Sequence, residues 1–261
     1  MRGYGQLTKK YQSITNKIYP LVFVTLLISV WWGISAFEVV PSFLLPSPPT
    51  VIEALVDDFS ILANHAVVTI GQALLGLALS IVVGVLTASL MDRFEFLYLA
   101  VYPVLIVTQT IPTIAIAPLL ILWLGFGILP KVLLIFITCF FPITVSTLSG
   151  LRSVDPDIIS LMKSMGASKM QILIKVKLKA ALESFFAGLK LATAYSIIGS
   201  VIAEWLGGSR GLGVYMTRVR NAYALDKLFA VIIVISVISL LLMVLVNIIH
   251  KKSMPWKNND S

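Results

Sequence analysis

The chain has 261 residues, of which 58% are hydrophobic and only 12% charged, and its formal net charge is +8. A soluble domain usually carries about 25% charged residues, so this composition excludes an ordinary water-soluble protein. The basic balance does not indicate a nucleic-acid partner, because a membrane protein gathers lysine and arginine on its cytoplasmic side.

Six apolar runs are long enough to cross a bilayer as helices, which takes about 20 residues. The fifth run is broken only by Lys190, which lies near one end and can extend its ammonium to the headgroups. Because backbone groups in lipid must be satisfied within the segment, the sequence predicts an all-α polytopic protein with about six transmembrane helices. In chain order the runs are 18–37, 66–91, 96–130, 132–151, 184–203 and 228–249.

The first run follows a basic start, as the apolar region of a signal peptide does. It is about twice as long as such a region, and no small-x-small cleavage site precedes Glu38. We therefore expect a retained first helix. The single cysteine, Cys139, lies inside an apolar run, so we expect a packing role and no intrachain disulfide.

The charges between the runs predict the orientation. With a cytoplasmic N-terminus, the cytoplasmic segments hold 14 of the 20 basic residues, and the first loop outside has four acidic residues and no basic one. The positive-inside rule therefore favours an N-in, C-in topology. Residues 205–227 do not fit, because this outside loop has four basic residues. The cytoplasmic segments are 1–17, 92–95, 152–183 and 251–261.

The third run, PVLIVTQTIPTIAIAPLLILWLGFGILP, has Pro103, Pro112 and Pro118 at membrane depth. Proline has no N–H to give to a helix, so we expect kinks or a break. Gln109 and several threonines add polar groups there. A broken helix in lipid needs protein or a water-filled cavity to satisfy its backbone. The run is therefore either part of a translocation pathway or a kinked packing helix, and the sequence does not separate the two.

Ionisable residues near the runs are few. Glu204 directly follows the fifth run and His65 directly precedes the second, and we expect both at a membrane interface. Ionisable residues within a span often mark a relay of protons. Their scarcity here argues against a proton-coupled carrier.

Residues 152–183 form the one sizeable polar segment, and it begins with a helix signal. Asp155 is a good N-cap, and Pro156 suits the first helical position. The helix can run through Met165, with Gly166 next in the left-handed conformation that ends many helices.

A second helix signal follows directly. Ser168 and Gln171 have the spacing of a capping box, which opens a helix at Lys169. The segment is therefore predicted to be helix, glycine turn, helix. It is either an amphipathic hairpin resting on the membrane surface or a docking element for a cytoplasmic partner. Its apolar residues are Leu161, Met162, Met165, Ile172, Leu173 and Val176.

This segment and its surroundings resemble a known family. KSMGASKMQILIKVKLKAALESFFAGLKLATAYSIIGSVIAEWLGG is similar to the cytoplasmic-loop signature of binding-protein-dependent ABC importer permeases. Within this family, the segment resembles one group in particular. That group comprises the permeases for alkanesulfonate, taurine and nitrate and their relatives for thiamine-pyrimidine and riboflavin-type compounds. LLPSPPTV, IPTIAIAPLLILWLGFG, FFPITVSTLSGL and GLGVYM also resemble this group, in the expected order, over residues 44–216.

The chain departs from the family pattern at two places. The family's opening Glu-Ala-Ala aligns with Ser160, Leu161 and Met162, and its proline aligns with Lys179. The glycine is kept as Gly166. A role usually assigned to the glutamate therefore does not carry over to this chain.

The resemblance implies a type I ABC importer permease fold, with coupling helices around Gly166 that sit in a cleft of an ATP-binding subunit. ATP and Mg would be bound by that subunit, with no cofactor on this chain. The implied partners are a second copy of the permease, two cytoplasmic ABC ATPase subunits, an extracytoplasmic solute-binding protein and membrane lipid. The implied docking residues are Leu161, Met162, Met165, Gly166, Ala167, Ser168, Lys169, Gln171 and Ile172.

We expect a multi-pass protein of the inner membrane of a prokaryote, in three parts. Residues 1–60 would hold the N-terminal tail, the first helix and an outside loop. Residues 61–250 would form the importer transmembrane domain with the coupling loop 152–183, and residues 251–261 a cytoplasmic tail.

Two rival classes fit less well. An enzyme is disfavoured because the chain has no H-E-x-x-H, G-x-S-x-G or G-x-x-x-x-G-K-[ST] motif and only two histidines. ATP hydrolysis is therefore expected on a separate chain. A secondary carrier or channel would predict internal inverted repeats, and none is visible between the two halves of the sequence.

The sequence thus predicts a permease subunit that forms the pathway for a small organic solute. The resemblance, in AYSIIGSVIAEWLGG above all, favours a thiamine pyrimidine precursor or a riboflavin-type compound as the solute, and the alternatives are an alkanesulfonate, taurine or nitrate. Glu204 is expected at the outer end of the pathway or its gate, or else paired with Arg210. The expected pathway residues are Gln109, Thr110, Thr113, Tyr195, Ser196, Ser200 and Glu204.

Overall fold

The computed structural model describes residues 3–254 of the chain, and this part is helical throughout. The predicted tail, 251–261, therefore lies largely outside the described residues. The helices are α1 (Gly3–Ala36), α2 (Pro48–Asp57), α3 (Phe59–Arg93), α4 (Glu95–Thr108), α5 (Thr113–Leu124), α6 (Leu129–Arg152), α7 (Pro156–Ser164), α8 (Lys169–Ile172), a π-helical turn η1 (Leu173–Lys177), α9 (Leu178–Gly207), α10 (Leu212–Asn221) and α11 (Leu225–Ser253).

Five of the described helices are long and apolar enough to cross a membrane, and the bent pair α4–α5 raises the number to six. This confirms the six runs predicted from the sequence. The two helices of the pair meet at 102° across the break at residues 109–112. Pro112 caps α5, whereas Pro103 and Pro118 remain inside their helices. Of the three prolines, Pro112 is therefore the one at which the chain leaves the helix.

The core is formed by α3, α6 and α9, which pack along one another. Glycines allow the close approach. A Cβ on Gly76 would come within 2.4 Å of the Ile135 side chain, and one on Gly188 within 2.5 Å of the Pro142 carbonyl. Small residues at such crossings are typical of membrane helices, which associate through van der Waals packing. Cys139 lies in this core, fully buried, as predicted.

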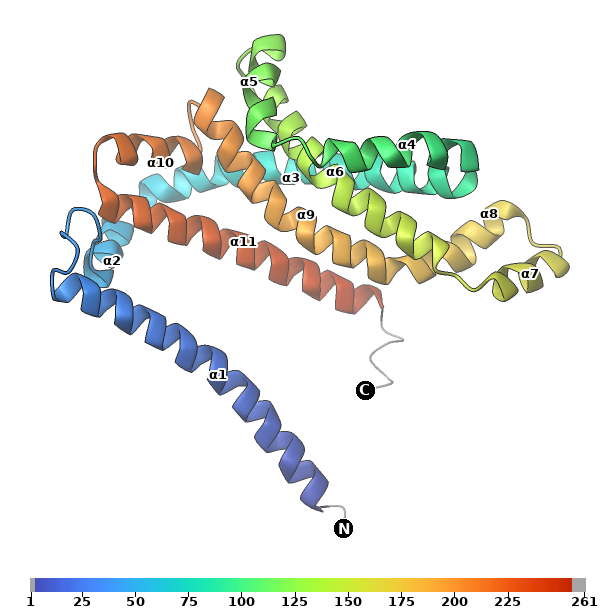
Figure 1. Cartoon of the computed structure of the whole chain (residues 1–261), viewed down its shortest axis with the longest axis horizontal. Helices are drawn as coiled ribbons and strands as arrows, with labels where there is room; N and C mark the ends of the chain where they lie inside the picture. Colours follow the sequence, from blue (N-terminus) through green and yellow to red (C-terminus); the bar gives the residue numbers. More distant parts are fainter. Residues whose placement is uncertain (1–2, 255–261) are drawn as a thin grey trace.

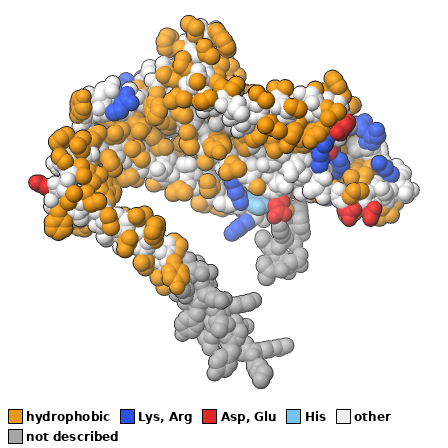
Figure 2. All heavy atoms as spheres, viewed as in Figure 1, with side chains coloured by type: hydrophobic (Ala, Val, Ile, Leu, Met, Phe, Trp, Pro, Cys, Tyr) orange, Lys and Arg blue, Asp and Glu red, His pale blue; other side chains and the backbone are white. Residues whose placement is uncertain are grey.

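The bundle has two distinct ends (Figure 1). At one end lie α2 and α10, and at the other α7 and α8. We call the first the outer end and the second the inner end, following the predicted topology. Figure 2 shows hydrophobic side chains over most of the surface between them, and a cluster of lysine and arginine at the inner end. This distribution suits a bilayer across the middle of the bundle.

The first helix, α1, joins the bundle only near its outer end and points away from it along the rest of its length (Figure 1). Trp31 makes the attachment: its ring stacks on Phe229 at 5.6 Å, and its Nε1 donates to the Pro46 carbonyl at 3.1 Å. Between residues 18 and 36, α1 is almost wholly exposed within this chain.

Candidate functional site

The hairpin at the inner end is built by local signals that the sequence carries. The Asp155 side chain accepts a hydrogen bond from the Asp157 N–H at 2.8 Å, so it caps α7 as predicted. The helix ends at Ser164, one residue earlier than expected. Gly166 then adopts φ +77°, and the chain closes a Schellman turn. In that turn the N–H of Gly166 donates to the Lys163 carbonyl at 2.9 Å, and the N–H of Ala167 to the Met162 carbonyl at 3.0 Å.

The second helix opens with the predicted capping box. The Gln171 N–H donates to Ser168 Oγ at 3.2 Å, and the Ser168 N–H donates to Gln171 Oε1 at 2.7 Å. The helix is not a separate short one, however. From Lys169 it runs through η1 into α9 as a single 39-residue segment. Lys179, at the position where the family has proline, keeps its N–H, so nothing there interrupts the helix.

Apolar side chains of the hairpin face away from the bundle. No residue of α7 is buried, and Leu161 and Met165 are 62% and 75% exposed. Ile172 is the exception, because it is buried and anchors α8. An exposed apolar patch of this kind on a capped, rigid turn is suited to a partner's cleft.

Two ion pairs join helices at the inner end, on either side of the hairpin. Lys177 Nζ lies 2.7 Å from Asp92 Oδ1 at the end of α3, and both side chains are largely buried. Arg152 pairs with Glu95 of α4 at 3.0 Å, and its guanidinium lies 3.6 Å from the centre of the Tyr98 ring. The first pair therefore ties the segment after α8 to α3, and the second ties the end of α6 to α4.

At the outer end, Glu204 is buried in a hydrogen-bond network. Its Oε1 accepts from Thr69 Oγ1 at 2.8 Å, and its Oε2 accepts from the Gly213 N–H at 2.7 Å. Of the two alternatives for Glu204, the pairing with Arg210 is wrong, because among the described residues Glu204 makes no ion pair within 4.0 Å. Its partners come from α3 and α10, and sequence patterns could not bring these together.

The same network fastens the start of α10. Thr69 Oγ1 also accepts from the Leu212 N–H at 2.8 Å, and His65 Nδ1 accepts from the Gly211 N–H at 2.9 Å. Gly211 has φ +128°, and a Cβ there would come within 2.1 Å of the Glu204 carboxyl carbon. Glycine is therefore required at the point where α10 closes over Glu204.

A second polar cluster lies where α3 begins. Asp58 accepts a hydrogen bond from the Tyr215 hydroxyl and pairs with Lys227 Nζ at 2.7 Å. The Lys227 hydrogen bond, and then that of Tyr215, hold the pKa of Asp58 below its ordinary value. Burial and the neighbouring Asp58 raise the pKa of Tyr215. One basic residue of the outside loop that did not fit the charge rule is thus neutralised by an acid of the first outside loop.

The expected pathway residues fall into two groups. Gln109 and Thr110 are exposed at the α4–α5 bend, Thr113 begins α5 partly exposed, and Tyr195 is 42% exposed on α9. Ser196 and Ser200 are instead buried in the core of this chain. The Ser196 hydroxyl donates to the Thr193 carbonyl at 2.8 Å, and that of Ser200 to the Thr69 carbonyl at 3.2 Å. Which of them line a pathway stays a prediction.

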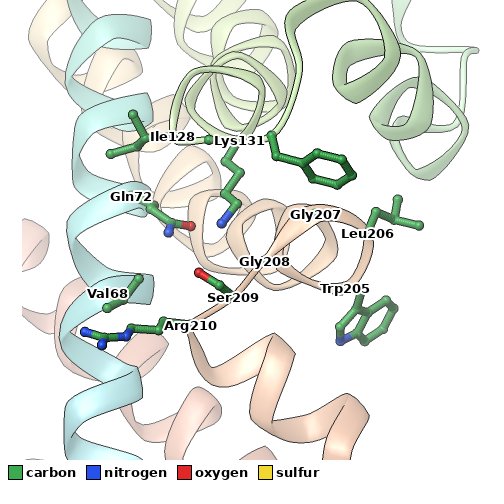
Figure 3. Close-up of a pocket in the computed structure, with 12 residues that line it drawn as sticks. Val68, Gln72, Ile128, Lys131, Trp205, Leu206, Gly207, Gly208, Ser209 and Arg210 are labelled. Atoms are coloured by element: carbon green, nitrogen blue, oxygen red, sulfur yellow. The ribbon is translucent and has the colours of Figure 1, made fainter.

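An outer cleft of about 700 Å³ opens beside Glu204, between α3, α6 and the α9–α10 turn. The main charged residue of the cleft is Lys131, which the sequence did not indicate as a site residue. In the sequence it lies between two apolar runs and marks only their boundary. Figure 3 shows the Lys131 side chain reaching toward Gln72 and Ser209. The cleft is lined by Val68, Gln72, Phe126, Gly127, Ile128, Lys131, Trp205, Leu206, Gly207, Gly208, Ser209 and Arg210.

Comparison with known proteins decides the family. Residues 80–254 match the family described as the binding-protein-dependent transport system inner membrane component. The chain belongs to this family. Over 97% of its length it is 35% identical to the whole of the formylaminopyrimidine transport permease protein ThiX of Halalkalibacterium halodurans. It is 32% identical to the putative aliphatic sulfonates transport permease protein SsuC of Bacillus subtilis, over 96% of this chain and 90% of that one.

Solved structures show the same fold. The inward-facing MetNI methionine ABC transporter matches with a TM-score of 0.67 at 18% identity, over 75% of this chain and 97% of that one. An amino acid ABC transporter matches with a TM-score of 0.60 at 15% identity, over 76% and 94%. The chain therefore has the type I ABC importer permease fold that its sequence predicted.

Membership settles the coarse role of the protein. It is a multi-pass inner-membrane permease of an ABC importer, not an enzyme, and ATP is hydrolysed on a separate chain. A binding-protein-dependent system implies two kinds of partner, an ATPase and a solute-binding protein.

Proposed function

We propose that two copies of this chain form one translocation pathway for a small organic solute, which an extracytoplasmic binding protein delivers. Two cytoplasmic ATPase subunits would bind ATP and Mg and drive the cycle, with no cofactor on the permease itself. The observation that carries the proposal is the inner hairpin, a capped turn around Gly166 with exposed apolar side chains. Family membership supports it.

The hairpin would be the docking site for the ATPase. Its cap, turn and capping box hold α7 and α8 in one geometry, so that the partner meets a rigid surface. Closure of the ATPase pair on ATP would pull the two hairpins together and switch the membrane helices from inward- to outward-facing. The proposed docking residues are those predicted from the sequence: Leu161, Met162, Met165, Gly166, Ala167, Ser168, Lys169, Gln171 and Ile172.

The pathway would run along the bent third span and α9. Gln109, Thr110 and Thr113 lie at the α4–α5 bend, where exposed polar groups suit a face turned toward a second copy. Glu204 would set the outer end of the pathway, because it holds α10 in place over α9. These pathway assignments assume that two copies of the chain face each other across the pathway.

The solute of first choice is a pyrimidine precursor of thiamine, because the relative at 35% identity is named for formylaminopyrimidine transport. A riboflavin transport permease of Chloroflexus aurantiacus, at 30% identity, supports the wider vitamin class. The alternative is an alkanesulfonate, taurine or nitrate, which the 32% identity to SsuC favours.

The docking role is tested at Gly166. Gly166→Val should strain the left-handed turn, because a β-branched residue resists φ near +77°. No heavy atom lies within 4 Å of the added Cβ, so the effect is one of backbone conformation alone. We expect the variant to lose most ATPase subunit on purification through a tag on the permease. Gly166→Asn is the control, because asparagine tolerates this conformation. Full assembly and solute-stimulated ATPase activity of Gly166→Val would refute the docking role.

The solute is best identified through the partner binding protein. That protein, purified with the importer, should be stabilised against heat by its own ligand. A larger shift with formylaminopyrimidine than with riboflavin, taurine or nitrate supports the first choice. A shift confined to taurine or nitrate selects the alternative.

A further inference from the structure

The outer cleft contains a lysine, Lys131, that makes no direct contact with an opposite charge among the described residues. Lys131 is 7% exposed, yet among the described residues its ammonium makes no hydrogen bond, and no ion pair within 4.0 Å. No buried side-chain nitrogen or oxygen in that part of the chain lacks a partner. The Lys131 nitrogen is therefore not sealed in protein but opens into the cleft, as Figure 3 shows. A buried ammonium is costly unless something of opposite charge meets it.

The charges around the cleft leave it positive. Arg210 lines the same cleft and also a neighbouring one of about 490 Å³, which Arg218 and His65 border. Glu204 lies near enough to attract Lys131. Its carboxylate, however, is already occupied by hydrogen bonds from α3 and α10. The residues that line the two clefts thus include two arginines and a lysine, and no acid.

The first turn of α6 adds to the positive electrostatic potential of the cleft. Gly127, Ile128 and Lys131 all border the cleft, so the N-terminus of α6 meets it, and no side chain caps that end. A helix N-terminus favours negative charge. Gln72 supplies a neutral amide from α3 on the opposite wall.

We propose that the outer cleft is a subsite for an oxyanion of the transported solute, a carboxylate, sulfonate or phosphate group. Lys131 and Arg210 hold the charge, and Gln72 donates a further hydrogen bond. The proposal rests on the permease role proposed above. It requires a solute that bears an acidic group, and so it selects the alternative solutes over the pyrimidine precursor. Such a group would enter from the extracytoplasmic side, because the cleft lies at the outer end. Of the two solute classes, the cleft chemistry favours the acidic one.

Binding to the purified full-length permease tests this without ATP or partners, so its result is separate from that of the docking test. The probe is methanesulfonate, with dimethyl sulfone as a neutral molecule of similar shape. Methanesulfonate should raise the thermal unfolding temperature of the natural chain, and dimethyl sulfone should not. Ionic strength is held constant with chloride.

Variants locate the binding. Lys131→Met should weaken methanesulfonate binding by roughly 10- to 100-fold, because it removes a charge-assisted hydrogen bond. Lys131→Arg should restore most of it, and Arg210→Gln should show a smaller loss. Arg220→Gln is the matched control, since Arg220 is exposed at the same end and borders neither cleft. If Lys131→Met does not fold, Lys131→Arg and Arg210→Gln still decide the question.

Three outcomes would overturn the proposal. The first is protection by methanesulfonate that Lys131→Met and Arg210→Gln leave unchanged. The second is equal protection by chloride, which marks a general salt effect. The third is a Lys131-dependent stability that follows the phosphatidylglycerol content of the surrounding lipid and not methanesulfonate, which assigns the cleft to a headgroup.

Discussion

Thr69 donates its hydroxyl to Glu204 across 135 positions of sequence, at 2.8 Å, in the buried outer end of the bundle. The same oxygen accepts the N–H of Leu212 at 2.8 Å. One threonine thus joins three helices, α3, α9 and α10. The position of α10 against α3 and α9 depends on this hydroxyl.

Replacing Thr69 with valine keeps the shape of the side chain and removes both hydrogen bonds. It leaves the buried Leu212 N–H without its acceptor, so we expect a loss of about 1–3 kcal/mol in the free energy of unfolding. Thermal unfolding of the purified permease measures it. Thr69→Ser keeps the hydroxyl and should stay near the natural chain. Equal stability of the valine and serine variants would show that the two hydrogen bonds of Thr69 do not contribute to the free energy of unfolding.

The Lys177–Asp92 pair should matter more than the Arg152–Glu95 pair. In the first, both side chains are largely buried, at 18% and 7% exposure, whereas Glu95 is 68% exposed. Lys177→Met should destabilise the inner end by about 1.5–3 kcal/mol, because it leaves a buried carboxylate unpaired. Glu95→Gln should change stability by about 0–1 kcal/mol. Chemical denaturation of both variants compares them.

A double variant tests the pairing itself. Lys177→Met combined with Asp92→Asn should recover part of the lost stability, because no buried charge remains alone. Simple addition of the two single losses would instead mean that the residues act independently.

Acid should weaken the outer end through Asp58. Because Lys227 and Tyr215 lower the pKa of Asp58 in the folded chain, its ion pair contributes stability fully above the ordinary value of 3.8. That contribution is lost as the pH falls below 3.8 and through the lowered folded value. We expect the natural chain to lose stability more steeply than Asp58→Asn in this window. Thermal unfolding at a series of pH values measures the two slopes, and parallel curves would contradict the assignment.

The helix crossing at Gly76 has no room for a methyl group. Gly76→Ala would place a Cβ 2.4 Å from Ile135, so we expect a loss of about 1–3 kcal/mol from overpacking. Gly71→Ala, in the same helix with nothing within 4 Å, should be neutral or slightly stabilising. The difference between the two unfolding temperatures is the measurement. A tolerated alanine at 76 would mean that α3 and α6 can separate at little cost.

Local structure was predictable where the signal and its partner lie within a few residues. The Asp155 cap, the Gly166 turn and the Ser168–Gln171 box each close over two to five positions, and all three are present. A break in the third span was likewise predictable from its prolines, but the sequence did not indicate that Pro112, of the three, would make it. Span number and the permease family followed from run length and motif order.

The outer end was not predictable in the same way. Glu204 was expected at an interface or beside Arg210, its neighbour in sequence, but its partners come from Thr69 and Gly213. Lys131 marks only a boundary between two apolar runs in the sequence, and its burial could not be predicted because it depends on packing against α3 and α9. A lone lysine at the outer start of a span, against the positive-inside rule, was the one local signal that could have found it.

Helix α9 runs from Leu178 to Gly207 and can act as a lever. Figure 1 shows that the chain bends between α8 and α9, where the π-helical turn η1 lies. The 30 residues of α9 measure about 45 Å at 1.5 Å per residue, with the inner end of the bundle at its start and Glu204 near its other end. A rotation of roughly 5° about the inner end of α9 would move its outer end by about 4 Å, more than the length of a hydrogen bond. A small angular input at the cytoplasmic face is thus amplified into a stroke large enough to break the Glu204 network.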